Sequence, residues 1–214
     1  MHTSVTSSAG WVVKLRRFVC PPPVEFCELC HVEIPSEHPH LIDIADRRLV
    51  CACPACSILF DGRTDGKFRC VPRRTQVLTD FRLTDAEWNA LHIPIGLAFL
   101  FHSALDGRPI ALYPGPAGTT ESFVGEEAWS MLILNNPELA DLAPDVEALL
   151  VNRTKRRREY YRVSIDHCFA LVGLIRTRWR GLSGGAEVWD AINAYFARLQ
   201  DPRSDGGSGR FRHG

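Results

Sequence analysis

The chain has 214 residues, of which 45% are hydrophobic and 23% are charged, a composition typical of a folded globular protein. Lys and Arg together number 25, as do Asp and Glu, so the formal net charge is zero. This balance argues against a general affinity for nucleic acid or for anionic membranes, and a nucleic-acid partner is not expected.

Residues 1–23 are expected to be disordered or to form a short helix before the proline run at 21–23. Residues 1–10 lack the apolar core of an export signal, and no apolar run reaches the ~18 residues that span a bilayer. We therefore expect a cytoplasmic protein in a reducing compartment, where cysteines bind metals more often than they form disulfides. Export together with a partner that carries its own signal stays open.

A cysteine-rich module is predicted over residues 24–75. It contains two Cys-x-x-Cys pairs, Cys27 with Cys30 and Cys53 with Cys56. Each pair can point two thiolates at one ion, and the segment between the pairs is long enough for a hairpin that brings them together. Four converging thiolates are typical of a tetrahedral zinc site and, less often, of a single iron ion. We therefore predict a metal site with these four cysteines as its ligands.

The segments around the cysteines predict the kind of module. Strands are expected at 41–44 and 48–51, joined by a turn at 45–47, and again at 67–71. This is the order of elements in a zinc-ribbon or treble-clef-like module. The segment has few large apolar residues, so the ion is expected to supply much of its folding energy.

Neighbouring residues leave the ligand set open. Cys51 or His40 could replace one of the four cysteines, or Cys51 could lie beside the metal without binding it. His38 and His40 could also form a second site with the clustered thiols, although exposed histidines on a polar loop are the more common arrangement.

The residues beside the cysteines bear on the identity of the metal. The pair Cys53 and Cys56 resembles half of a rubredoxin iron site, in which glycine normally follows each pair. His31 and Ser57 occupy those positions here, which favours zinc over iron. The sequence Cys-x-x-Cys-His at 27–31 also matches the covalent haem motif, but that use requires export and leaves the second pair unexplained.

From about residue 76 to residue 200, apolar periodicity predicts a mixed α+β domain. Thr84 and Glu87 have capping-box spacing at the start of a helix. Asp166 is expected to cap a later helix that ends near Trp179. Other helices are expected at 126–134 and 186–199, strands at 93–101, 110–113, 146–151 and 160–163, and a disordered tail at 201–214.

The segment 113–122 is predicted to be a loop that carries ligand- or partner-binding groups. Its prolines and glycines expose backbone N–H groups, and it precedes a helix whose N-terminus could attract an anion. It lacks the Gly-Lys-Ser/Thr of a phosphate loop, so a packed turn capped by hydroxyls is the plainer interpretation. The candidate residues are Tyr113, Gly118, Thr119, Thr120, Glu121 and Ser122.

A basic run beside two tyrosines is a second candidate surface. Such a run is usually a solvated loop, but it could also dock an acidic protein partner, with single-stranded nucleic acid as a weaker alternative. Its residues are Arg153, Lys155, Arg156, Arg157 and Arg158.

No catalytic residues are predicted. Asp166, His167 and Cys168 are adjacent, but neighbours on a helix point about 100° apart, which is poor geometry for a catalytic dyad. A cap followed by core packing is the simpler interpretation. No acid–base pair can be named elsewhere, so the chain is not expected to be an enzyme, and an enzyme acting on a small ligand at 113–122 ranks last.

Several motifs taken together resemble one family. They lie at residues 27–30, 38–41, 51–56, 59–60, 93–95, 113–122, 145–153 and 179–185. In this order they resemble an uncharacterised bacterial family, known only as a domain of unknown function, whose members are often encoded beside high-affinity uptake nickel–iron hydrogenases. The resemblance spans about residues 25–199. It implies a role around a hydrogenase, in assembly, in metal or electron handling, or as a bound accessory subunit.

The function expected from these observations is that of a non-enzymatic accessory protein with a structural four-cysteine zinc site. It would dock to a nickel–iron hydrogenase or assist its assembly. The alternative is a rubredoxin-like iron protein that transfers electrons for that hydrogenase.

Overall fold

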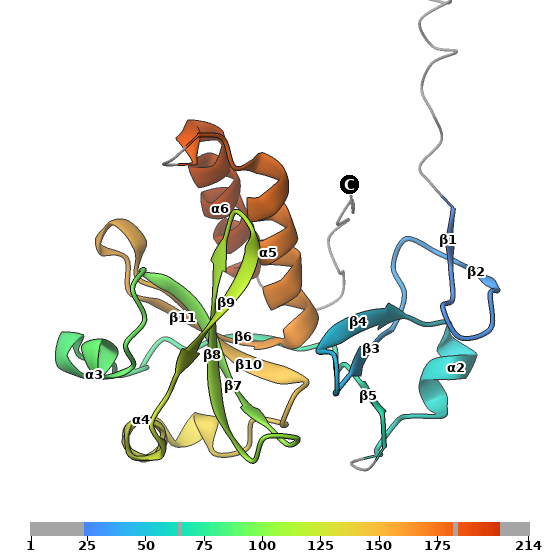
Figure 1. Cartoon of the computed structure of the whole chain (residues 1–214), viewed down its shortest axis with the longest axis horizontal. Coiled ribbons are helices and arrows are strands. Elements are labelled where there is room, and N and C mark those ends of the chain that lie inside the picture. The colour runs from blue at the N-terminus through green and yellow to red at the C-terminus, as the bar shows by residue number, and fades with distance from the viewer. Residues whose placement is uncertain (1–23, 64–65, 182–183, 202–214) are drawn as a thin grey trace, which may run out of the picture.

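The computed structural model describes residues 24–63, 66–181 and 184–201, and Figure 1 shows how their elements are arranged. The predicted N-terminal segment 1–23 and all but the first residue of the predicted tail lie outside the described residues. In the described part of the chain, no helix is long and apolar enough to cross a membrane. The elements mix helices with antiparallel sheets, so the predicted α+β class is confirmed.

Short strands around one small helix form the cysteine-rich part (Figure 1). Its elements are β1 (Glu25–Phe26), β2 (Glu33–Ile34), β3 (His40–Asp43), β4 (Arg48–Cys51), α2 (Pro54–Ile58) and β5 (Phe68–Cys70). β1 pairs with β2, and β3 lies between β4 and β5 in a three-stranded antiparallel sheet. The strand predicted at 48–51 is confirmed, whereas the strand predicted at 41–44 begins and ends one residue earlier.

The later strands form one six-stranded antiparallel sheet in the order β6-β11-β10-β7-β8-β9. They are β6 (Thr75–Val77), β7 (Leu97–Ser103), β8 (Arg108–Gly115), β9 (Gly118–Phe123), β10 (Glu147–Asn152) and β11 (Glu159–Ser164). The helices of this part are α3 (Asp85–Ala90), α4 (Glu126–Asn135), α5 (Ile165–Arg178) and α6 (Gly185–Leu199), with 3-10 turns η2 (Pro137–Leu139) and η3 (Thr154–Arg156).

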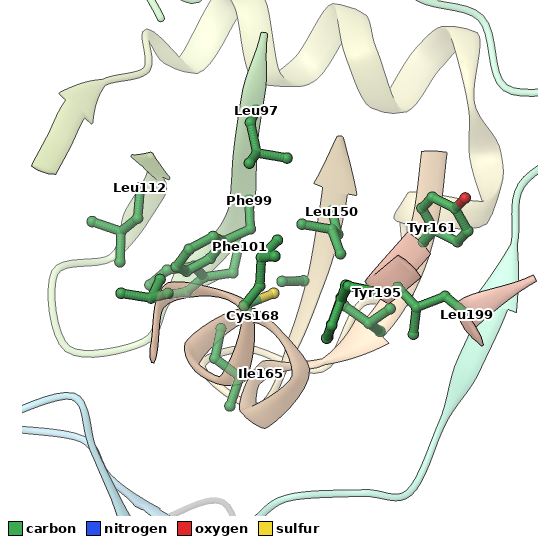
Figure 2. Close-up of a cluster of buried hydrophobic side chains, with 14 of the residues drawn as sticks. Leu97, Phe99, Phe101, Leu112, Leu150, Tyr161, Ile165, Cys168, Tyr195 and Leu199 are labelled. Atoms are coloured by element: carbon green, nitrogen blue, oxygen red, sulfur yellow. The ribbon is translucent and has the colours of Figure 1, made fainter. Parts of the chain in front are cut away.

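Both faces of the six-stranded sheet are covered, which explains the continuous apolar runs of its central strands β7 and β10. On one face Phe99, Phe101 and Leu150 belong to a core that includes residues of α5 and α6, as Figure 2 shows. On the other face Leu100 and Leu149 belong to a second core with residues of α3 and α4. Successive side chains thus alternate between two cores.

The two predicted helix starts have different outcomes. Thr84 and Glu87 form the predicted capping box, in which the Glu87 carboxylate accepts from the Thr84 N–H at 2.7 Å. The prediction that Asp166 caps a helix is wrong, because α5 begins at Ile165 and Ser164 is its N-cap residue. The Asp166 carboxylate is therefore available for a contact outside its own helix.

The prediction of a loop at 113–122 is also wrong, because this segment is a β-hairpin. β8 and β9 stay paired up to Gly115 and Gly118, so only residues 116–117 form the turn. Gly118 has a φ of 131°, a conformation that side chains other than glycine rarely adopt. The hydrogen bonds between β8 and β9 engage backbone N–H and C=O groups that a loop would leave exposed.

The cysteine-rich part packs directly on the six-stranded part. Ile42 of β3 and Val71, which follows β5, belong to the core on the α5 and α6 face. Arg69 of β5 donates a hydrogen bond to the Asp145 carboxylate at 2.9 Å. The two parts therefore share apolar core and a buried ion pair.

Candidate metal centre

Four cysteine thiols converge in the cysteine-rich part. The sulfur atoms of Cys27, Cys30, Cys53 and Cys56 lie within 4.8 Å of one another, and those of Cys30 and Cys53 are 3.7 Å apart. A tetrahedral ion with Zn–S bonds of about 2.3 Å places neighbouring sulfur atoms about 3.8 Å apart. The cluster, which we refer to as the four-thiol centre, therefore has the dimensions of a four-coordinate metal site.

The first pair lies in a tight turn between β1 and β2. The Cys27 N–H donates to the Val32 carbonyl at 2.8 Å, and the His31 N–H donates to the Cys27 carbonyl at 2.8 Å. His31 has a φ of 61°, in the left-handed region that glycine favours. The backbone thus makes the turn expected of glycine although a histidine occupies the position.

The first turn of α2 presents the second pair. Cys53 is the N-cap residue, Pro54 begins the helix, and the Cys53 sulfur accepts from the Cys56 N–H at 3.4 Å. The Ser57 N–H donates to the Cys53 carbonyl at 2.9 Å, as in a regular helix. The two pairs therefore differ in backbone structure.

Ionisation of one thiol of the centre affects the others. Burial opposes the Cys27 thiolate, but backbone N–H groups of Cys53, Cys30 and Leu29 stabilise it and lower the pKa of Cys27 to about 6. Hydrogen bonding with Cys30 and Cys53 instead raises the pKa of Cys56 to about 12. A cation bound between the sulfur atoms would compensate the charge that four thiolates bring together.

Cys51 and His40 lie outside the four-thiol centre. They form a second cluster with His38, in which one ligand atom of each residue lies within 4.8 Å of the others. Glu28 holds Cys51 in place: the Glu28 N–H donates to the Cys51 carbonyl at 2.9 Å, and the Glu28 carboxylate accepts from the Cys51 N–H at 2.8 Å. Since Glu28 lies between Cys27 and Cys30, this contact ties the first pair to β4.

Asp166 and Cys168 are two residues apart on α5 but contact different parts of the structure. The Asp166 carboxylate contacts His40, with 3.0 Å between Oδ2 and Nδ1. Burial opposes a charge on His40, but Asp166 and Cys51 raise the pKa of His40 to about 9. Cys168 is fully buried in the core beneath α5, which raises its pKa well above the usual range. Core packing is therefore the role of Cys168, whereas the contact of Asp166 with His40 was not predicted.

The candidate residues of the segment 113–122 have separate partners. Glu121 accepts hydrogen bonds from Arg108 at 2.7 Å and from Arg47 at 2.9 Å, and these cations lower the pKa of its carboxyl. The Ser122 hydroxyl donates to the carbonyl of His92 at 3.1 Å. Tyr113 and Gly118 are half-buried, and the exposed members are Thr119, Thr120 and Glu121.

The basic run is divided by burial. Arg153 is only 8% exposed, donates to the Leu83 carbonyl at 2.9 Å and to Asp85, and lies over the Trp88 ring. Arg153 is therefore a buried structural residue and does not belong to the exposed patch that the sequence predicted. Arg157 is half-buried and bonded to Glu159, and the exposed members are Lys155, Arg156 and Arg158.

Comparisons with known proteins place the chain in a family but find no characterised relative. No curated protein and no solved structure matches the chain. A family of unknown function, DUF5947, matches residues 26–203, which is most of the chain. This match confirms the predicted membership of an uncharacterised family. It carries no information on the predicted association with a hydrogenase. The chain belongs to the family of unknown function DUF5947.

Proposed function

We propose that the chain is a non-enzymatic accessory protein whose module, residues 24–75, is held together by one zinc ion at the four-thiol centre. The observation that carries this proposal is the convergence of Cys27, Cys30, Cys53 and Cys56 within 4.8 Å. Four protein ligands complete the coordination sphere of a tetrahedral zinc ion, which is the arrangement found in structural zinc sites. The strands of the module are two to four residues long, so the ion would contribute much of its folding energy.

The order of elements supports a treble-clef-like module rather than a zinc ribbon. A short turn carries the first cysteine pair, the β3–β4 hairpin follows, and the first turn of α2 carries the second pair. A zinc ribbon would hold the second pair in another turn instead of a helix.

Rubredoxin-like iron is the alternative occupant, and the second pair argues against it. A rubredoxin site uses two similar turns whose backbone N–H groups approach the sulfur atoms. Here the Ser57 N–H bonds to the Cys53 carbonyl inside α2, so it does not point at sulfur. This difference supports zinc.

Elemental analysis and visible absorption of protein purified without oxygen test this proposal. Zinc and a featureless visible spectrum are expected for the wild type. Cys56→Ser should lose one zinc ion per chain, whereas Cys70→Ser, which lies outside both clusters, should lose none. Iron, with thiolate-to-iron bands that bleach on reduction, would contradict the proposal and support electron transfer.

We further propose that the partner is a subunit or maturation factor of a nickel–iron hydrogenase. The support is the resemblance of the sequence motifs to a family encoded beside such enzymes, which is an association and not a contact. The exposed cations Lys155, Arg156 and Arg158 suit an acidic surface on that partner, and the tip of the β8–β9 hairpin is a second candidate surface.

Charge reversal tests the docking proposal. The double variant Arg156→Glu and Arg158→Glu should weaken co-purification of the hydrogenase with the chain. The double variant Arg176→Glu and Arg178→Glu reverses two exposed charges on α5 and is the matched control. Equal recovery of the hydrogenase with all three proteins would remove the basic run from the proposal.

A further inference from the structure

The second cluster, formed by His38, His40 and Cys51, lies at the open end of the β3–β4 hairpin. His40 and Cys51 are directly opposite each other on the two strands. The Ala52 N–H donates to the Pro39 carbonyl at 3.0 Å, so His40 and Cys51 form a non-hydrogen-bonded pair, the kind whose side chains lie closest. The hairpin itself therefore brings an imidazole and a thiol together.

His38 contributes a buried nitrogen, Nε2, that has no hydrogen-bond partner in the part of the chain that the structure describes. The residue is 7% exposed, and its Nδ1 lies 2.9 Å from the Pro35 carbonyl oxygen. A carbonyl only accepts, so Nδ1 carries the proton and Nε2 presents a lone pair. Glu25 lies 3.4 Å from the same Nδ1 and also favours a proton there. Nε2 has no hydrogen-bond partner among the described residues, and leaving a buried acceptor unpaired is costly.

His40 is oriented in the same way by a carboxylate. Its Nδ1 faces Oδ2 of Asp166 at 3.0 Å, which leaves Nε2 as the nitrogen available to the cluster. The Ser164 hydroxyl and the His167 N–H donate to the other Asp166 oxygen at 2.7 and 2.9 Å and fix it in position. Metal-binding histidines usually donate their second N–H to a carboxylate or a backbone carbonyl, and both supports are present here.

We propose that His38 Nε2, His40 Nε2 and Cys51 Sγ bind a divalent transition-metal ion at a second site, separate from the four-thiol centre. Two imidazoles and one thiolate suit zinc, cobalt, nickel or copper and are poor ligands for magnesium and calcium. Three protein ligands leave the fourth position of a tetrahedral ion open. An ion at this site can exchange its fourth ligand, which the ion of the four-thiol centre cannot do without losing a cysteine.

Zinc content and zinc X-ray absorption of the full chain test this site. The protein is purified without oxygen, equilibrated with zinc sulfate and desalted. We expect about two zinc ions per chain, with both nitrogen and sulfur neighbours. His38→Ala and Cys51→Ser should each halve the zinc content and leave sulfur neighbours only. His92→Asn, which replaces an exposed histidine outside both clusters, should keep the wild-type content.

The possible outcomes separate the two sites. One zinc ion with only sulfur neighbours in the wild type would overturn the second site and leave the four-thiol centre intact. One zinc ion with nitrogen neighbours would support the second site and contradict zinc at the four-thiol centre. If a variant misfolds, the wild-type spectrum still decides, because the four-thiol centre supplies sulfur ligands alone, whereas the second site also supplies nitrogen ligands.

Discussion

His40 and Asp166 are 126 residues apart in the chain, and 3.0 Å separate the His40 Nδ1 from the Asp166 Oδ2. His40 begins β3 of the cysteine-rich part, whereas Asp166 lies in the first turn of α5. Each side chain is only 18% exposed. This pair therefore links the two parts of the molecule at a place where water screens the charges only weakly.

Asp166→Asn should lower the free energy of unfolding by about 1.5–3 kcal/mol, because the hydrogen bond to His40 loses its charged acceptor. Urea denaturation measures the change. Asp46→Asn removes an exposed carboxylate from the β3–β4 turn and should change stability by less than about 0.5 kcal/mol. Equal effects of the two variants would mean that the His40–Asp166 contact adds nothing to stability.

Metal removal by a chelator should lower the melting temperature of the whole chain and not only unfold the cysteine-rich part. The reason is that Ile42 and Val71 belong to the core beneath α5 and α6. Calorimetry and hydrogen exchange measure the two effects, and restoring zinc is the control. An unchanged melting temperature, with loss of exchange protection confined to residues 25–70, would show that the two parts are energetically independent.

Gly96→Ala and Gly173→Ala should have opposite effects. A Cβ at residue 96 would lie 2.8 Å from the backbone carbonyl group of Arg153, so we expect a loss of about 1–3 kcal/mol. A Cβ at residue 173, inside α5, would meet no atom of the described residues within 4 Å apart from the backbone of its own helix. There alanine should stabilise the helix by about 0.5–1 kcal/mol. Thermal melting of both variants checks the signs, and a neutral Gly96→Ala would refute the close backbone approach.

Arg153→Met should destabilise the fold by about 1.5–3 kcal/mol, chiefly because the buried Leu83 carbonyl loses a charged donor. The bond to Asp85 adds little, since that carboxylate is mostly exposed. Arg156→Met, in the exposed part of the same run, should stay within about 0.5 kcal/mol of the wild type. Denaturant titration compares them, and a neutral Arg153→Met would contradict the structural role.

The four-thiol centre could be predicted because cysteine spacing is a local property of the chain. Each Cys-x-x-Cys pair fits a single turn, and the intervening hairpin has its own strand pattern. The capping box of α3 was predicted for the same reason, since Thr84 and Glu87 are three residues apart.

The second cluster depends on the register of β3 against β4, which the predicted strand bounds miss by one residue. Strands at 41–44 and 48–51 would pair residue 41 with Cys51, whereas the structure pairs His40 with Cys51 because Ile44 belongs to the turn. A shift of one residue moves a side chain to the opposite face of a sheet. Arg47 has a φ of 51°, so this turn contains a residue in the left-handed conformation. Glycine is the usual sequence signal for that conformation, and the position holds arginine instead.

Long-range contacts explain the other differences. Nothing near Asp166 in the sequence indicates that its partner is His40, so the local pattern predicts a helix cap instead. The sequence groups Arg153 with its charged neighbours, although its hydrogen bonds reach Leu83 and Asp85. The prolines and glycines of 113–122 indicate a loop by composition, although Gly115 and Gly118 flank a two-residue hairpin turn.

Ile42 and Val71 lie before β6 in the chain but complete the core beneath α5 and α6. A truncation near residue 75 would remove both and leave apolar side chains of the six-stranded part facing water. The cysteine-rich part thus supplies side chains to the core of the six-stranded part. Deletion of the cysteine-rich part is for this reason a poor test of what the six-stranded part does. Point substitutions in the intact chain are the better test.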